Sequence, residues 1–158
     1  MDQSSRLKIA LGADHGGYLL KEELKRYLIS EGWQVEDFGT FSEEPVDYPD
    51  LAFKIAKAVA LGEFPQGILV CTTGIGVSIA ANKVKGVKAA LCHEPLSAEL
   101  ARRHNHANIL CLGGKIIGPK LALKIVETWL STPFSTEERH IRRLKKIEEI
   151  EEKKDDNF

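Results

Sequence analysis

The chain has 158 residues, 43% of them hydrophobic, which suffices for one domain with an ordinary buried core. Lys and Arg total 22 and Asp and Glu total 23, and this balance argues against nucleic acid or an anionic membrane as a bulk electrostatic partner. No apolar run approaches the ~20 residues that span a bilayer. The first eight residues lack the apolar core of a signal peptide, and the three cysteines form an odd set, so we expect a cytoplasmic protein with reduced thiols.

The first half of the chain alternates apolar runs with segments at helical spacing. Residues 7–13 predict a strand, 18–30 an amphipathic helix and 33–38 a second strand. A loop at 39–45 leads to a helix over 47–61, because a proline and acidic residues in the first turn suit a helix start.

The second half continues this alternation. In chain order it predicts a strand at 67–71, a glycine turn at 72–76, a helix to about residue 84, a strand at 88–92, a helix at 95–103, a strand at 109–112 and a helix at 119–130. Strands that are apolar on both faces and joined by helices are typical of a parallel sheet covered on both sides. We therefore expect a Rossmann-like, three-layer α/β/α core with a five-stranded parallel sheet over residues 7–134.

The tail has a different pattern. Ser135 and Glu138 match a capping box, with Ser135 reaching forward and Glu138 reaching back, and predict a helix over 135–153. Apolar residues recur in it at every third position: Ile141, Leu144, Ile147 and Ile150. This apolar stripe is too narrow to stabilise a helix alone. We therefore expect it to pack on the domain or on a second subunit. We expect a single domain over 1–158, with flexible ends at 1–6 and 154–158.

Polar residues at the strand ends are the candidates for a functional site, because ligands bind beyond the carboxyl ends of open parallel sheets. They are Asp14 and His15 after the first strand, Cys71, Thr72, Thr73 and the turn Gly74-Ile75-Gly76 after the third, His93 after the fourth, His104, Asn105 and His106 before the fifth, and Lys115 after it. The glycines of the third-strand turn let successive backbone N–H groups point into one concavity. Such a concavity suits an anion or a developing oxyanion.

This turn is similar to two nucleotide-binding motifs and completes neither. A Walker loop needs Lys and then Ser or Thr after its last glycine, but Val77-Ser78 follows Gly76. The dinucleotide fingerprint needs Gly or Ala where Ile79 stands. Because Glu94 lies about the ~20 residues downstream that a ribose contact requires, a dinucleotide site stays open as an alternative.

Cys71 lies between a strand and a helix start, where the helix dipole and backbone amides would stabilise a thiolate. Cys92 and Cys111 lie within apolar runs and are best explained as small buried hydrophobes, an interpretation that stays open for Cys71. A metal site of His15, Cys71 and His104 is possible by residue type. No Cys-x-x-Cys or His-Glu-x-x-His spacing supports one, so we expect no metal.

Arg139 and Arg143 are four residues apart, so they share a face in the first turns of the tail helix. Cations near a helix N-terminus are disfavoured by ~0.3–1 kcal/mol each. A bound phosphate would reverse this penalty, since guanidinium groups bind phosphate through two hydrogen bonds. A solvated basic face, paired with nearby glutamates, is an equally good interpretation of these residues alone.

Together these motifs resemble the type B ribose-5-phosphate isomerases, a family that includes galactose-6-phosphate and allose-6-phosphate isomerases. The motifs that carry the resemblance are Ala13-Asp14-His15-Gly16-Gly17, Val46-Asp47-Tyr48-Pro49, Cys71-Thr72-Thr73-Gly74-Ile75-Gly76, Arg103-His104-Asn105, Asn108 and Arg139-His140 with Arg143. They occur in order and at matching distances over residues 7–147. Two residues depart from the family pattern: Thr72 stands where many relatives have Gly, and Lys115 where Arg is frequent, which keeps the charge but loses the two-pronged contact.

The resemblance implies isomerisation of ribose 5-phosphate to ribulose 5-phosphate, or of a hexose 6-phosphate such as allose or galactose 6-phosphate. A non-catalytic sugar-phosphate-binding subunit is the alternative outside enzymes. The implied catalytic residues are Cys71 as the base that moves a proton between C1 and C2, Thr73 at the oxyanion, and His104 with Asp14 at the furanose ring. The implied binding residues are His15, Lys115, Arg139 and Arg143 at the phosphate, the backbone of Gly74, Ile75 and Gly76 at the oxyanion, and Tyr48 and Asn105 along the pocket. The resemblance also implies a homodimer or homotetramer with sites completed by two subunits, and no metal or organic cofactor.

Overall fold

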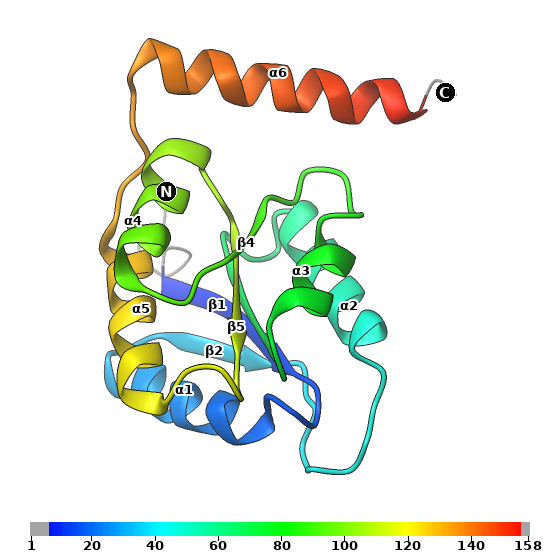
Figure 1. The fold of residues 1–158 in the computed structure, drawn as a ribbon, viewed down its shortest axis with the longest axis vertical. Coiled ribbons are helices and arrows are strands. Elements are labelled where there is room, and N and C mark those ends of the chain that lie inside the picture. Colours follow the sequence, from blue (N-terminus) through cyan, green and yellow to red (C-terminus); the bar gives the residue numbers. More distant parts are fainter. Residues whose placement is uncertain (1–6, 156–158) are drawn as a thin grey trace.

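A five-stranded parallel sheet forms the centre of the molecule in the computed structural model, which describes residues 7–155 (Figure 1). The strands are β1 (Lys8–Ala13), β2 (Gln34–Asp37), β3 (Gly67–Cys71), β4 (Ala89–Leu91) and β5 (Ile109–Gly113). The helices are α1 (Tyr18–Ser30), α2 (Tyr48–Ala60), α3 (Ile75–Ala81), α4 (Pro95–Asn105), α5 (Pro119–Ser131) and α6 (Glu138–Asp155). The strand order is β2-β1-β3-β5-β4.

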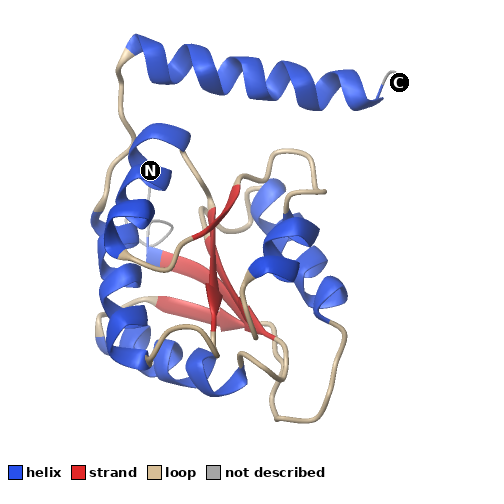
Figure 2. Ribbon diagram, in the orientation of Figure 1, coloured by secondary structure: helices blue, strands red, loops and turns tan. Residues whose placement is uncertain are grey.

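Two hydrophobic cores lie on opposite faces of the sheet. Helices α1, α4 and α5 cover one face and α2 and α3 cover the other (Figure 2). Successive strand residues point into different cores: Ile68 and Val70 face the first core, whereas Leu69 and Cys71 face the second. The predicted three-layer α/β/α fold with five parallel strands is therefore confirmed.

Two helices around β4 end at residues other than those predicted. Helix α3 ends at Ala81, three residues before the predicted end. The side chain of Asn82, which follows, exchanges two hydrogen bonds with the backbone of Ala89, at 2.9 and 2.8 Å. Helix α4 continues two residues further than predicted, to Asn105. His106 then adopts a left-handed conformation (φ 48°) that ends the helix.

Helix α6 begins at Glu138, three residues later than the capping box predicts. The Ser135 hydroxyl instead accepts the amide of Glu137 at 3.1 Å. At the other end, the helix continues into the segment expected to be flexible and ends at Asp155, while residues 1–6 and 156–158 lie outside the described part of the chain. Of the predicted apolar stripe only Leu144 is buried. The carboxylate of Glu151 accepts the amide of Gly86, which ties the far end of the helix to the domain.

Candidate active site

Cys71 is the last residue of β3 and lies in a tight turn. Its Sγ atom accepts the backbone N–H of Gly74 at 3.0 Å, and its side chain is buried. Gly74 has φ +78°, and a Cβ there would lie 2.5 Å from the Leu91 side chain, so only glycine fits the turn. A hydrogen-bond donor at the sulfur stabilises negative charge there, which suits a reactive thiolate.

The remainder of this turn uses its own side chains as hydrogen-bond partners. The hydroxyl of Thr73 accepts the Ile75 amide at 3.2 Å. The amides of Gly74 and Ile75 are thus bound inside the turn by Cys71 and Thr73. The sequence, in contrast, predicts that successive amides of this turn are open to a ligand. Tyr48, the first residue of α2, covers the turn closely: a Cβ at Gly76 would lie 2.5 Å from its ring.

Asp14 and His15 follow β1 and lie beside the turn. The amide of Asp14 donates to the carbonyl of Val70, and one carboxylate oxygen accepts the amide of Gly17, both at 3.1 Å. The Nδ1 atom of His15 accepts the amide of Val46 at 3.2 Å. Because Nδ1 is the acceptor, the neutral imidazole carries its proton on Nε2 and can donate a hydrogen bond from there.

The loop after β5 brings Lys115 to the same place. Gly114 donates its amide to the carbonyl of Cys71 at 2.8 Å, and Lys115 donates to the carbonyl of Thr72 at 3.0 Å. The lysine side chain is exposed. The structure thus gathers one set of predicted residues, which we name the carboxyl-end cluster: Asp14, His15, Tyr48, Cys71, Thr73, Gly74, Ile75, Gly76 and Lys115.

His104 and Asn105 lie at the opposite end of the sheet. They form the last turn of α4 and shortly precede Asn108, whose carbonyl accepts the amide of Gly67, the first residue of β3, at 3.0 Å. Cys71 is the last residue of the same strand, four steps of about 3.3 Å away, or roughly 13 Å along the sheet. Within a single chain, His104 and Asn105 therefore do not lie in one strand-end cleft with Cys71.

Helix α6 supplies the neighbours of His104. The His104 ring stacks on that of His140, with centroids 4.2 Å apart and planes 26° apart. His140 is buried, and its Nδ1 lies 2.7 Å from the hydroxyl of Ser135. Burial lowers the pKa of His140, the neighbouring His104, Arg139 and Arg143 lower it further, and Glu137 offsets part of this decrease.

Arg139 and Arg143 flank His140 on α6 and are exposed. Arg139 Nε forms an ion pair with Glu137 at 2.8 Å. We name this second set the α4–α6 cluster: His104, Asn105, Arg139, His140 and Arg143. Figure 1 shows α6 at the top of the view and the loops after β1 and β3 at the bottom. The sequence contains His140 in the motif Arg139-His140 but does not predict its role, because its ring contact links two helices that are far apart in the chain.

The structure also tests the alternatives. Glu94 caps α4, where its carboxylate accepts the amides of Leu96 and Ser97 at 2.7 Å each, so it is engaged away from any ribose. The three candidate metal ligands do not lie together, because His104 is at the opposite end of the sheet from His15 and Cys71. Among the side chains that the structure describes, no three of His, Cys, Asp or Glu are grouped as metal ligands are.

Cys92 and Cys111 are buried in the two hydrophobic cores. Burial raises the pKa of Cys92 to about 11 and also raises that of Cys111, which keeps both thiols protonated inside the cores. His106 stacks on Phe134 with centroids 4.4 Å apart. The Nε2 atom of His93 is buried and has no hydrogen-bond partner within the described residues.

The chain is similar to known proteins in sequence and in fold. The sequence model of the family described as Ribose/Galactose Isomerase matches residues 9–147. Ribose-5-phosphate isomerase B of Escherichia coli is 46% identical over 93% of this chain and 98% of its own. The solved structure of Clostridium thermocellum ribose-5-phosphate isomerase B superposes with a TM-score of 0.90 at 52% identity, over 92% of this chain and 98% of that one. A D-erythrulose-4-phosphate isomerase of Pectobacterium atrosepticum is 44% identical over 81% of this chain and 85% of its own.

Proposed function

The chain belongs to the ribose/galactose isomerase family, and on that premise we propose that it interconverts ribose 5-phosphate and ribulose 5-phosphate. This reaction moves a proton between C1 and C2 and leaves the phosphate unchanged. It needs a base, donors for a developing oxyanion and a grip on the remote phosphate. The observation that carries the proposal is the Cys71 thiol, which accepts the Gly74 amide at 3.0 Å beyond the carboxyl end of β3.

In this mechanism the Cys71 thiolate removes the proton from C2 of the open-chain aldose. The electrons of the C2–H bond form the C1–C2 double bond of an enediolate, and negative charge develops on O1. A proton passes from O2 to O1, and the proton held by Cys71 is delivered to C1, which gives the ketose and restores the thiolate. The hydroxyl of Thr73 already accepts the Ile75 amide, so its own proton is left to donate to the oxyanion.

The other residues prepare and hold the substrate. His104 opens the furanose ring with help from Asp14. One carboxylate oxygen of Asp14 accepts the amide of Gly17, and the other oxygen can accept a hydrogen bond from the substrate. The residues that bind the phosphate are His15, Lys115, Arg139 and Arg143, with the proton on His15 Nε2 serving as a donor. Tyr48 and Asn105 line the pocket. In the turn Gly74-Ile75-Gly76, the first two amides are bound by Cys71 and Thr73, and the Gly76 amide is left to face the reacting end. No metal or organic cofactor takes part in this scheme.

We propose that two copies of the chain complete each site. The sheet lies between Cys71 and His104 within one chain, so one substrate cannot contact both. A symmetric dimer would place the carboxyl-end cluster of one copy against the α4–α6 cluster of the other and would form two identical sites. The exposed residues Ile141, Ile147 and Ile150 of α6 supply apolar surface for such a contact. The three free cysteines fit a reducing cytoplasm.

A substrate panel tests the proposed activity. We expect kcat/KM to be highest for ribose 5-phosphate, lower for allose 6-phosphate and galactose 6-phosphate, and lower for a four-carbon phosphate. A higher kcat/KM for a six-carbon phosphate would assign the hexose activity instead. Binding of these sugars without turnover would identify a non-catalytic sugar-phosphate-binding subunit.

A further inference from the structure

The segment from Gly39 to Asp47 connects two residues of the carboxyl-end cluster. It has no helix or strand, and from residue 41 onward it is exposed. At its end it leads directly into Tyr48, and the amide of Val46 donates to His15. The segment therefore contacts His15 and ends at Tyr48.

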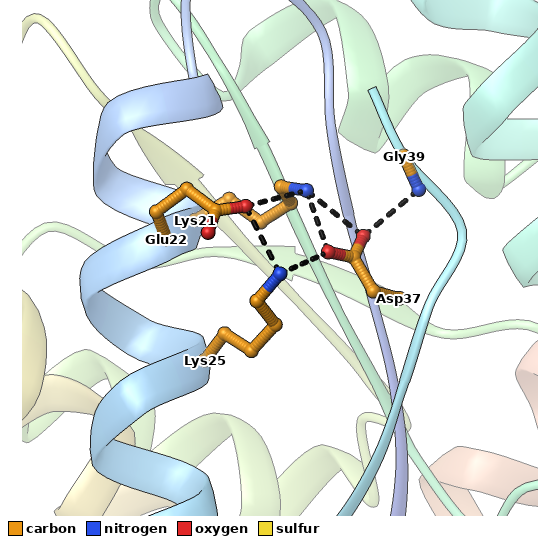
Figure 3. A network of polar contacts seen from close by, with 5 residues as sticks. All are labelled: Lys21, Glu22, Lys25, Asp37 and Gly39. Atoms are coloured by element: carbon orange, nitrogen blue, oxygen red, sulfur yellow. Dashed lines mark hydrogen bonds and ion pairs between the residues drawn. The ribbon is translucent and has the colours of Figure 1, made fainter. Parts of the chain in front are cut away.

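A quartet of charged residues holds the start of this segment (Figure 3). The ammonium of Lys21 contacts both carboxylate oxygens of Asp37, at 2.9 and 2.7 Å, and lies 3.1 Å from Glu22. Lys25 bridges Glu22 at 3.1 Å and Asp37 at 2.9 Å. Asp37 in turn accepts the amide of Gly39 at 2.9 Å through Oδ1. Asp37 thus connects two lysines of α1 to the first amide of the segment.

Lys21 is the most buried member, with a side chain that is 0% exposed. Its ammonium also lies 4.8 Å from the ring centroid of Phe41, within the segment, and 5.4 Å from that of Tyr18. Burial raises the pKa of Asp37, but hydrogen bonds from Lys21, Lys25 and Gly39 outweigh burial and leave this pKa below its ordinary value. The carboxylate is therefore charged at neutral pH and can accept all of these donors.

Stability alone does not account for a buried lysine at this place. An apolar pair of similar volume is often as stable as a buried ion pair, because desolvating two charges offsets much of their attraction. What an apolar pair cannot supply is an acceptor for the Gly39 amide. Gly39 and Thr40 also form backbone hydrogen bonds with Ala13. The Ala13 amide donates to the Gly39 carbonyl at 2.7 Å, and the Ala13 carbonyl accepts the amide of Thr40. Ala13 directly precedes Asp14 and His15 in the carboxyl-end cluster.

We propose that Asp37, held by Lys21, is a positioning residue that fixes the Gly39–Asp47 segment so that His15 and Tyr48 are set for the substrate. Asp37 and Lys21 do not touch the reacting atoms, so we expect their replacement to change substrate binding. This inference rests on the proposed isomerase function for its kinetic consequence, whereas the anchoring of the segment can be measured in the protein without substrate.

Two double variants separate anchoring from folding. Lys21→Met with Asp37→Asn removes the buried charge pair but keeps an oxygen that accepts the Gly39 amide. Lys21→Met with Asp37→Leu removes the pair and the acceptor together. Both variants leave the ion pair of Lys25 and Glu22 in place, and neither leaves a buried lysine without its acid. Arg26→Met, which removes an exposed ion pair with Glu23 on the same helix, is the matched control.

Hydrogen exchange of the segment's amides and steady-state kinetics on ribose 5-phosphate are measured for each variant. In the Asp37→Leu pair we expect faster exchange at Gly39 and Thr40 and about a three- to tenfold rise in KM with kcat nearly unchanged. The Asp37→Asn pair and Arg26→Met should stay near the wild-type protein in both measurements.

Equal exchange and equal KM in the two double variants would overturn the proposal, as would faster exchange without a change in KM. A loss of kcat in the Asp37→Leu pair as large as the rise in KM would also overturn it, because a general loss of structure would explain both. If the wild-type protein does not isomerise ribose 5-phosphate, the proposed function fails, and the exchange rates still decide whether Asp37 anchors the segment.

Discussion

The imidazole rings of His104 and His140 are stacked with centroids 4.2 Å apart, which joins the last turn of α4 to the first turn of α6. The contact brings the proposed ring-opening residue next to the two proposed phosphate-binding arginines, which come from a segment more than thirty residues away in the chain. The stacked arrangement favours a neutral His140 ring. A proton on His140 would add a positive charge that repels Arg139 and Arg143.

The pKa of His140 predicts a loss of stability in acid. Burial and nearby positive charges lower this pKa below 6.5, so the unfolded chain binds more protons than the folded one between the two pKa values. The stability contributed by neutral His140 is therefore complete above about pH 6.5 and is lost as pH falls toward the lowered pKa. We expect the Tm of the substrate-free protein to fall over this range. His140→Phe keeps an aromatic ring and has no proton to gain, so it should reduce the fall.

Burial also lowers the pKa of His106, which contributes a change of the same sign to both proteins. The difference between the wild-type curve and the His140→Phe curve isolates His140. Two parallel curves of Tm against pH would show that His140 does not titrate differently in the folded and unfolded chains.

Replacing Cys71 tests the assignment of the base. We expect Cys71→Ala to lower kcat by at least about 10²–10⁴-fold, the usual contribution of general acid–base catalysis, with substrate affinity largely kept. The measurement is exchange of the C2 proton with deuterated water, which should stop. Cys92→Ala, a change at a buried thiol with a pKa of about 11, is the control and should retain kcat. Persistent exchange at C2 in Cys71→Ala would remove Cys71 from the role of base.

The arginines on α6 should affect binding of the phosphate group. Arg139→Ala or Arg143→Ala should each remove a charge-assisted hydrogen bond of about 1.5–3 kcal/mol, or roughly ten- to a hundredfold in kcat/KM. The same sugar without its phosphate should be much less affected. Arg142 is exposed on the same helix and outside the cluster, so Arg142→Ala is the control. Equal losses on both sugars would indicate that the arginines build the fold or the subunit interface.

Chelation tests the metal-free mechanism. Because the scheme assigns proton transfer to Cys71 and charge stabilisation to Thr73 and the turn backbone, prolonged treatment with a chelator should leave kcat unchanged. Loss of activity that one divalent ion restores would contradict this scheme.

The sequence predicted the centre of the sheet well because β1, β3 and β5 are buried on both faces and appear as apolar runs, and the predicted and observed bounds of β3 coincide. The position of His104 was harder to predict. The polar residues 104–106 resemble a loop, whereas residues 104 and 105 complete α4, which returns across the sheet and carries them to its amino end. The burial of Lys21 was hidden for a similar reason. A lysine on an amphipathic helix normally faces water, and its partner Asp37 lies 16 residues away on β2.

Complementation between inactive variants tests most directly whether two chains complete each site. Cys71→Ala and His104→Ala are each prepared alone and then produced together in one cell, so that mixed dimers form. If Cys71 of one copy works with His104 of the other, each mixed dimer has one intact site and one site with both lesions. At random pairing, half the dimers are mixed, and we expect about a quarter of the wild-type activity, far above either variant alone. Activity in the mixture no higher than in the separate variants would contradict the shared site.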